Sequence, residues 1–310
     1  MKQDLYKIKV NILILAFTII LLLFILKRKS NNVFLTKKDS KNVIKNSKYF
    51  SFFNKNDFKL RNCKNIKDCQ IKYENDLLDW NHLEKNKIKK IINKNIPKLT
   101  KYQNIFSNIK LIKSGDYIEN GLPHTRLDTI VIPKKHLDVE YYDFFSLIAH
   151  EQFHIFQRYN PELFTDFYIN SWDLLPLKHI PKKIMDISRG NPDALPDKMW
   201  GFKVEENEYI LPVCVYLKNS NKITDTKNVY FSYRIKNGKE DFYKLNEELE
   251  KLNTLASHKK YISYFGEYDS NYYHPNEISA SLFEILVECE LEKKTIPKIP
   301  AIIKLEEFLN

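Results

Sequence analysis

Glycine is scarce in this chain, with 6 residues in 310, whereas lysine, asparagine and isoleucine are abundant. This bias weakens any argument from the formal net charge of +11, because the lysines are spread along the whole chain. A nucleic-acid-binding protein would show a clustered basic patch and a known fold signature. The sequence has neither, so we expect no nucleic-acid partner. Its hydrophobic content of 43% suffices for one large domain, or for a small N-terminal region and one catalytic-sized domain.

Charged residues are also absent from residues 10–26, VNILILAFTIILLLFIL. This stretch is at the lower edge of membrane-spanning length. It runs directly into Lys27 without the small-residue cleavage site of a signal peptide. A buried core helix is disfavoured because the segment has no polar face. The sequence therefore predicts an uncleaved single-pass membrane anchor, with a flank at 1–9 before it and a basic polar tether at 27–60 after it.

The side of the membrane that the remaining chain faces depends on two opposing signals. The basic residues just after the anchor favour a cytoplasmic domain, but lysine is common throughout. Cys63 and Cys69 are close enough in sequence to form a short disulfide loop, which would favour an oxidising exterior; the alternative is that both are free. We expect an extracytoplasmic domain. Cys214 and Cys289 have no obvious partners.

Hydrophobic periodicity predicts a mixed α+β order and no internal repeat. Helices are expected at about 70–95, 138–158, 241–255 and 274–294. Strands are expected at 127–133, within 199–217 and at 228–235.

The helix at 138–158 contains His150-Glu151-Gln152-Phe153-His154. Positions i and i+4 project from one face of a helix, so both imidazoles can bind one ion. Glu151 lies one step round, where its carboxylate can reach a water on that ion. The pattern H-E-x-x-H is typical of a catalytic Zn²⁺ site with Glu151 as general base. The alternative is a surface helix with solvated histidines.

A third metal ligand is not found close to this motif. The residues after it lack the glycine and third histidine of the metzincin extension, with Gln157 and Asn160 in those places. Residues 276–281, Asn-Glu-Ile-Ser-Ala-Ser, resemble the second metal helix of thermolysin-type metallopeptidases, the gluzincins. By that resemblance Glu277 is the third zinc ligand. Glu284 and Glu288 on the same helix are rival ligands, and Glu277 could instead only stabilise the helix dipole.

The same resemblance implies a zincin-like catalytic domain at 61–310, with a long insertion at about 165–270. Its core would be a mixed sheet with the helix 138–158 beneath one edge and the last helix crossing it. Ser281 stands where the family usually has an aspartate that orients a zinc-binding histidine. Asp166 or Asp173 could serve instead.

A peptidase also needs a donor for the oxyanion of the tetrahedral intermediate. His274 and Tyr273 are favoured, because they immediately precede the helix of Glu277. His124, Arg126 and Tyr272 are alternatives, and each of these residues could instead be a cap or surface group. The turn-rich stretch 189–202 is either a cleft rim or an ordinary connector.

These features favour a membrane-anchored, zinc-dependent metallopeptidase with a peptide or protein substrate. A second hypothesis is a non-catalytic, metal-binding zincin-fold scaffold or sensor of the cell envelope. The intact Glu151 argues against it, because a protein that does not hydrolyse has no need of that carboxylate. A third is a basic, membrane-tethered interaction protein in which the motif is accidental.

Overall fold

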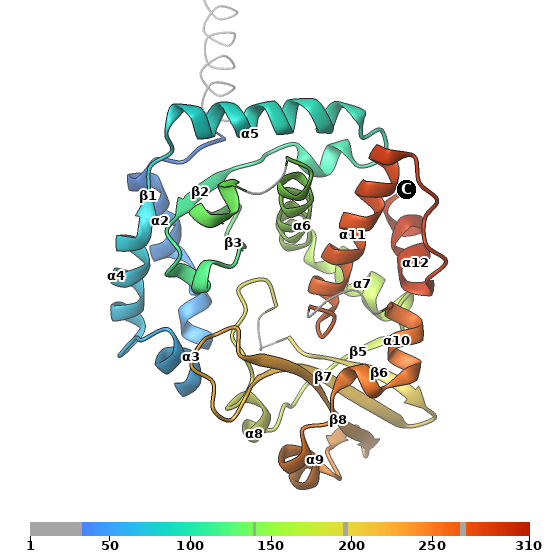
Figure 1. Cartoon of the computed structure of the whole chain (residues 1–310). Coiled ribbons are helices and arrows are strands. Elements are labelled where there is room, and N and C mark those ends of the chain that lie inside the picture. The colour runs from blue at the N-terminus through green and yellow to red at the C-terminus, as the bar shows by residue number, and fades with distance from the viewer. Residues whose placement is uncertain (1–32, 139–140, 195–197, 267–270) are drawn as a thin grey trace, which may run out of the picture.

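The computed structural model describes residues 33–138, 141–194, 198–266 and 271–310. These residues form an α+β fold with 11 α-helices and two sheets (Figure 1). The α-helices are α2 (Lys37–Asn46), α3 (Lys55–Leu60), α4 (Ile66–Asp76), α5 (His82–Asn95), α6 (Tyr141–Tyr159), α7 (Pro161–Asn170), α8 (Lys182–Met185), α9 (Leu245–Lys251), α10 (Lys259–Phe265), α11 (Pro275–Glu292) and α12 (Pro300–Leu309). Short 3₁₀ turns are η1 (Lys48–Phe52), η2 (Ile96–Lys98), η3 (Gln103–Phe106), η4 (Ile118–Gly121), η5 (Lys134–Asp138) and η6 (Leu255–Ser257).

The first sheet is mixed and has the strand order β1-β2-β4-β3. Strand β2 is parallel to β4, and the two outer pairs are antiparallel. Both faces of the sheet are covered. Val131 packs into a small core with the N-terminal helices, whereas its neighbours Ile130 and Ile132 point into the main core. The strands are β1 (Leu77–Leu78), β2 (Leu111–Ser114), β3 (His124–Arg126) and β4 (Thr129–Pro133).

The second sheet is antiparallel throughout, with its five strands in sequence order. Alternate residues of β8, including Val229, Phe231 and Tyr233, belong to a third core with residues of α8 and α9. The opposite face contributes Phe202 and Ile210 to the main core. The strands are β5 (Leu174–Pro176), β6 (Trp200–Glu205), β7 (Glu208–Tyr216), β8 (Thr226–Lys236) and β9 (Lys239–Asp241).

Helices α6 and α11 pack against each other in the middle of the molecule, and both lie in the main core (Figure 1). Small buried residues, Ala149 on α6 and Ala280 on α11, allow close approach. The rings of Phe153 and Phe283 stack across the interface, with centroids 4.4 Å apart. Helix α6 also contacts β3 and β4. This packing fixes the first turn of α11 beside the middle of α6.

Most of the predicted elements are confirmed, and two predictions about the N-terminal half were wrong. The strand at 127–133, the helices at 138–158 and 274–294 and the strands within 199–235 are present with small changes in their bounds. The helix expected at 241–255 is confined to Leu245–Lys251, between β9 and η6. The single helix at 70–95 is instead two helices, because Leu77–Leu78 pair with β2 and Asn81 caps α5. The polar tether at 27–60 was also wrong for residues 33–60, which form α2, η1 and α3 around buried Ile44 and Phe50.

The predicted membrane-anchored fold and single-pass localisation require correction. Within residues 33–138, 141–194, 198–266 and 271–310, no helix is both long and apolar enough to cross a bilayer. The expected anchor at 10–26 and its flank at 1–9 lie outside the described residues. The expected core also differs, because the structure has two separate sheets where one mixed sheet was expected. We therefore assign an α+β fold to the described residues, without a membrane-spanning helix among them.

Cys63 and Cys69 form a disulfide at the start of α4, with Cα atoms 5.2 Å apart. Cys214 and Cys289 are buried free thiols. Of the alternatives that the sequence left open for Cys63 and Cys69, the structure has the paired one.

Candidate metal centre

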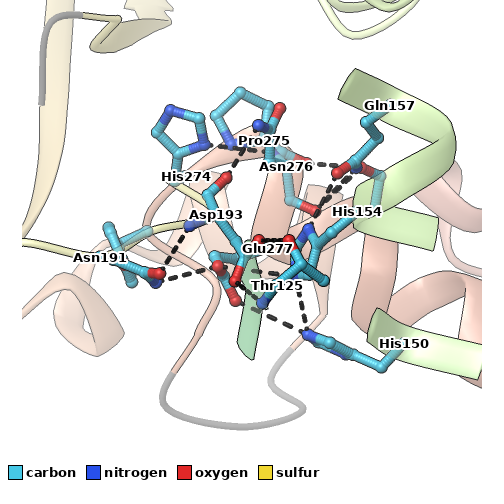
Figure 2. Close-up of polar contacts among 12 residues, drawn as sticks. Thr125, His150, His154, Gln157, Asn191, Asp193, His274, Pro275, Asn276 and Glu277 are labelled. Carbon is cyan, nitrogen blue, oxygen red and sulfur yellow. Dashed lines mark hydrogen bonds and ion pairs between the residues drawn. The ribbon is translucent and has the colours of Figure 1, made fainter. Parts of the chain in front are cut away.

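Three side chains from α6 and α11, those of His150, His154 and Glu277, point toward one another (Figure 2). The Nε2 atoms of His150 and His154 are 3.1 Å apart. The Glu277 carboxylate, in the first turn of α11, lies 3.7 Å from each of them, through Oε2 to His150 and Oε1 to His154. The helix begins there because Pro275 occupies its first turn and His274 accepts a hydrogen bond from the Asn276 amide. The sequence motif and the distant glutamate are therefore brought together by the α6–α11 packing.

The outer nitrogens of both histidines face acceptor oxygens. His150 Nδ1 is 3.1 Å from Glu284 Oε2, and His154 Nδ1 is 2.9 Å from Gln157 Oε1. The Gln157 amide nitrogen donates to the Asn276 carbonyl at 2.9 Å, which orients its oxygen toward His154. This network assigns the hydrogen of each ring to Nδ1. Each Nε2 then presents a lone pair toward the other, and this contact is repulsive unless a cation, either a proton or a metal ion, lies between them.

The separations of these three donor atoms suit a tetrahedral ion. Bonds of about 2.1 Å at tetrahedral angles place two ligand atoms about 3.4 Å apart. The observed separations are 3.1 Å for the two imidazoles and 3.7 Å for each imidazole–carboxylate pair. The outer contacts of the histidines with Glu284 and Gln157 are of the kind that orients metal-binding imidazoles. The residues therefore fit a divalent ion without rearrangement of the backbone.

The charges of the three residues complement one another. Burial opposes protonation of His150, but the carboxylates of Glu277 and Glu284 raise its pKa well above the ordinary value. Burial lowers the pKa of His154. Burial alone would raise the pKa of Glu277, yet His154 and His150 hold it below the ordinary value. The centre therefore stabilises positive charge between an ionised carboxylate and two imidazoles.

Glu151 lies at the same centre but is not one of these three residues. It is buried, and its Oε2 atom has no hydrogen-bond partner among the described residues. Ligand atoms of Glu151, His154 and Asp193 lie within 4.8 Å of one another. Burial, followed by the charge of Asp193, raises the pKa of Glu151 well above its ordinary value. A buried carboxylate without a hydrogen bond is costly, so it requires an explanation.

The connector at 189–202 contributes Asn191 and Asp193, which the sequence did not identify. The Asn191 amide donates to Glu277 Oε1 at 2.9 Å and to the Tyr273 hydroxyl at 2.8 Å. Asp193 accepts hydrogen bonds from the Thr125 amide and hydroxyl and from Arg158. Burial would raise the pKa of Asp193, but His154 and Arg158 lower it to about 2. Figure 2 shows both side chains beside Glu277 and His154.

The two favoured oxyanion residues have other partners. His274 Nδ1 accepts from the Asn276 amide, and its Nε2 faces the Lys198 carbonyl at 2.8 Å, so both ring nitrogens are engaged. Among the described residues, hydrogen bonds link Tyr273 to Glu277 through Asn191. Neither residue lines the cavity that contains His150. His274 is thus a helix cap, and that alternative from the sequence is the one the structure shows.

The other candidates are also placed. Arg126 is buried beside Glu119, 3.5 Å away, and His124 lines the cavity of the centre. Glu284 contacts His150 through the outer nitrogen, whereas Glu288 pairs with Lys294. Asp166 or Asp173 was expected to orient a zinc-binding histidine. In the structure the outer nitrogens of the two histidines instead contact Glu284 and Gln157.

Two cavities adjoin at the centre. The first, of about 370 Å³, is lined by His150, Glu151 and Glu277. The second, of about 350 Å³, is lined by Gln157, Tyr168 and Trp200. His154, Pro192 and Asp193 border both. The centre is therefore accessible to a small molecule from the first cavity.

The comparisons with known proteins give no match: no protein-family model, no curated protein and no solved structure matches this chain. The function is therefore argued from the centre itself.

Proposed function

We propose that this chain binds one Zn²⁺ ion through His150, His154 and Glu277 and hydrolyses an amide bond, with Glu151 as general base. The observation that supports the proposal is the convergence of three donor atoms beside a buried carboxylate that has no hydrogen bond. Two neutral imidazoles and one carboxylate form the ligand set of known zinc hydrolases, which leaves a fourth position for water or substrate.

The surroundings of Glu151 suit proton transfer. When bound, the zinc ion acts as a Lewis acid that lowers the pKa of water and polarises a carbonyl. Glu151 takes the proton from the attacking water and delivers it to the leaving nitrogen. The Oε2 atom, which has no hydrogen-bond partner among the described residues, gives that proton a place to reside. Burial excludes competing water from this carboxylate.

The substrate class is a peptide or a similar amide. The first cavity, of about 370 Å³, is at the lower end of the range for small-molecule sites. Only a short part of a peptide fits within it. Strand β3, at the edge of the first sheet, contributes His124 to this cavity.

The test compares wild type with Glu151→Gln, using zinc content and hydrolysis of a quenched fluorescent peptide library. The variant should bind one equivalent of zinc and lose hydrolysis by about 10²–10⁴-fold, as expected for loss of a general base. Glu162→Gln, an exposed glutamate at the start of α7, is the matched control and should retain full turnover. Unchanged turnover in Glu151→Gln would remove this residue from the mechanism.

A non-catalytic metal-binding function is the second candidate. It is favoured by the low exposure of the ligand side chains, 2% for His154 and 5% for Glu277, and by the contact of Asn191 with Glu277. In that case wild type binds zinc, and neither it nor Glu151→Gln hydrolyses any peptide in the library.

A further inference from the structure

The first cavity contains an arginine that has no acidic partner within 4.0 Å in the part of the chain that the structure describes. Arg189 lines this cavity together with His150, Glu151 and Glu277. Its side chain lies beside the Cys214 thiol, but it makes no hydrogen bond to a nitrogen or oxygen atom and no ion pair within 4.0 Å among the described residues. The Nε atom is fully buried. Arg189 as a whole is half-buried, and a guanidinium group partly removed from water without an acidic partner among the described residues is unfavourable, so its position suits a bound anion.

The other arginines of the described residues all have an acidic partner. Arg61 pairs with Asp57 and Glu119, and Arg158 pairs with Asp193. The remaining two, Arg126 and Arg234, pair with Glu119 and Glu208. Arg189 is therefore the exception, and it is the one arginine of the described residues that lines this cavity.

The backbone on both sides of Arg189 is held in place. Its amide donates to the Cys214 carbonyl at 2.9 Å. The next residue, Gly190, donates to Asp57 at 2.9 Å and accepts from the Tyr49 hydroxyl at 2.9 Å. A side chain at Gly190 would come within 3.0 Å of Asp57, so glycine fits this close approach. The guanidinium group is thus attached to a fixed point, which lowers the entropic cost of binding an anion.

Arg189 is also close to the proposed metal ligands. Asn191, two residues further on, donates to Glu277. Two residues span at most about 7 Å of backbone, so one short molecule can reach both the metal centre and Arg189. We infer that Arg189 is an anion-binding residue and that the ligand of this cavity is a short amide that carries a carboxylate. This inference rests on the proposed function for the position of the reacting group.

A carboxylate is the chemical group that fits best. The planar guanidinium fork matches the two oxygens of a carboxylate, and such paired hydrogen bonds are strong and directional. The hydroxyl-bearing residues Thr224 and Thr226 line the same cavity and add polar surface. The carboxylate could be the free C-terminus of a peptide or an acidic side chain.

The test uses two small probes that differ only in charge. Hydroxamates of the series succinic, glutaric and adipic acid carry a metal-binding group at one end and a carboxylate at the other. Each is compared with the probe in which the carboxylate is replaced by a neutral amide. Binding is measured by calorimetry on the zinc-loaded full chain and on the metal-free chain. At the best length, wild type should bind the acid about tenfold or more tightly than the amide, because hydrogen bonds between charged groups are strong.

Arg189→Gln should abolish this preference, and Arg189→Lys should retain part of it. Lys198→Gln is the control: it also removes one positive charge, but from the second cavity, and should keep the full preference. Thermal melting checks folding, and the Lys variant provides the answer if the Gln variant does not fold. Equal affinity of acid and amide in wild type, or a preference that survives Arg189→Gln, overturns the inference.

The design separates this inference from the proposed function. Tight binding of the amide-ended hydroxamate with no gain from the carboxylate leaves the metal centre intact and refutes the anion site. If the chain binds no zinc, the proposed function fails, and the acid–amide comparison on the metal-free chain still decides the role of Arg189. A second pair of hydroxamates, one ending in glycine with a free C-terminus and one in aspartate amide, identifies which source of carboxylate is preferred.

Discussion

Gln157 is the residue through which α11 controls the orientation of His154. Its oxygen faces His154 Nδ1 at 2.9 Å, and its nitrogen donates to the Asn276 carbonyl at 2.9 Å and to the Ser279 hydroxyl at 2.7 Å. We predict that Gln157→Leu weakens zinc binding by about 10- to 100-fold, the usual effect of removing a partner of a metal-binding histidine. The variant leaves the His154 N–H group without an acceptor and allows its ring to turn.

The same substitution should also destabilise the fold. It leaves one buried group, the His154 N–H, without an acceptor, and this loss costs about 1–3 kcal/mol. The Asn276 carbonyl keeps the hydrogen bond from the Ser279 hydroxyl at 3.2 Å. We therefore expect the free energy of unfolding of the metal-free chain to fall by about 1–3 kcal/mol. Urea unfolding measures this change, and competition with a chromophoric chelator measures the zinc affinity.

Gln152→Leu provides the matched control on the same helix. Gln152 is buried and donates to the Ile105 carbonyl at 3.0 Å, away from the metal centre. Its substitution should lower the free energy of unfolding by about 1–3 kcal/mol and leave the zinc affinity unchanged. If Gln157→Leu is destabilised yet binds zinc as tightly as wild type, then Gln157 does not orient a metal ligand and the reasoning is refuted.

Three further predictions concern stability. Arg61→Met leaves the buried Glu119 carboxylate without its nearest cation, the guanidinium group 2.7 Å away. The substitution should lower the free energy of unfolding by about 3–5 kcal/mol, and a loss below about 1 kcal/mol in urea unfolding would argue against a buried ion pair. Burial lowers the pKa of His274 to about 4 in the folded chain, so the unfolded chain binds more protons between pH 6.5 and 4. The free energy of unfolding should therefore fall by about 2 kcal/mol from pH 7.5 to 5, and a constant urea midpoint over this range would contradict the prediction. The Cys63–Cys69 disulfide closes a loop with a sequence separation of 6, and its reduction should lower the free energy of unfolding by about 2 kcal/mol. The melting temperature should therefore be lower in reductant, and an unchanged melting temperature would mean that the disulfide does not form.

The parts of the fold that follow local patterns could be predicted from the sequence. The strand at Thr129–Pro133 and the helices around His150 and Glu277 have strong periodicity and clear ends. The N-terminal segment was misread because its polar composition conceals single buried residues such as Ile44 and Phe50. Burial of a few side chains against a sheet that is distant in sequence leaves no local signal.

The candidate metal centre likewise contains residues that local patterns predict and residues that only tertiary contacts bring in. The spacing of His150 and His154 is local, so the pattern alone places both on one helix face. Gln157, three residues after His154, and Glu284, seven after Glu277, share the faces of those residues and could have been found by the same reasoning. Asp193 could not, because it reaches the centre from a connector whose path depends on tertiary contacts.

The most direct test of the central claim is a zinc titration of wild type, Glu277→Gln and Glu288→Gln. Glu288 is the matched control, because it lies on the same helix and pairs with Lys294. Wild type and Glu288→Gln should bind one zinc ion per chain with equal affinity, whereas Glu277→Gln should bind it far more weakly because it lacks the carboxylate that completes the ligand set. Absence of stoichiometric zinc in wild type, or equal affinity in Glu277→Gln, would contradict the account.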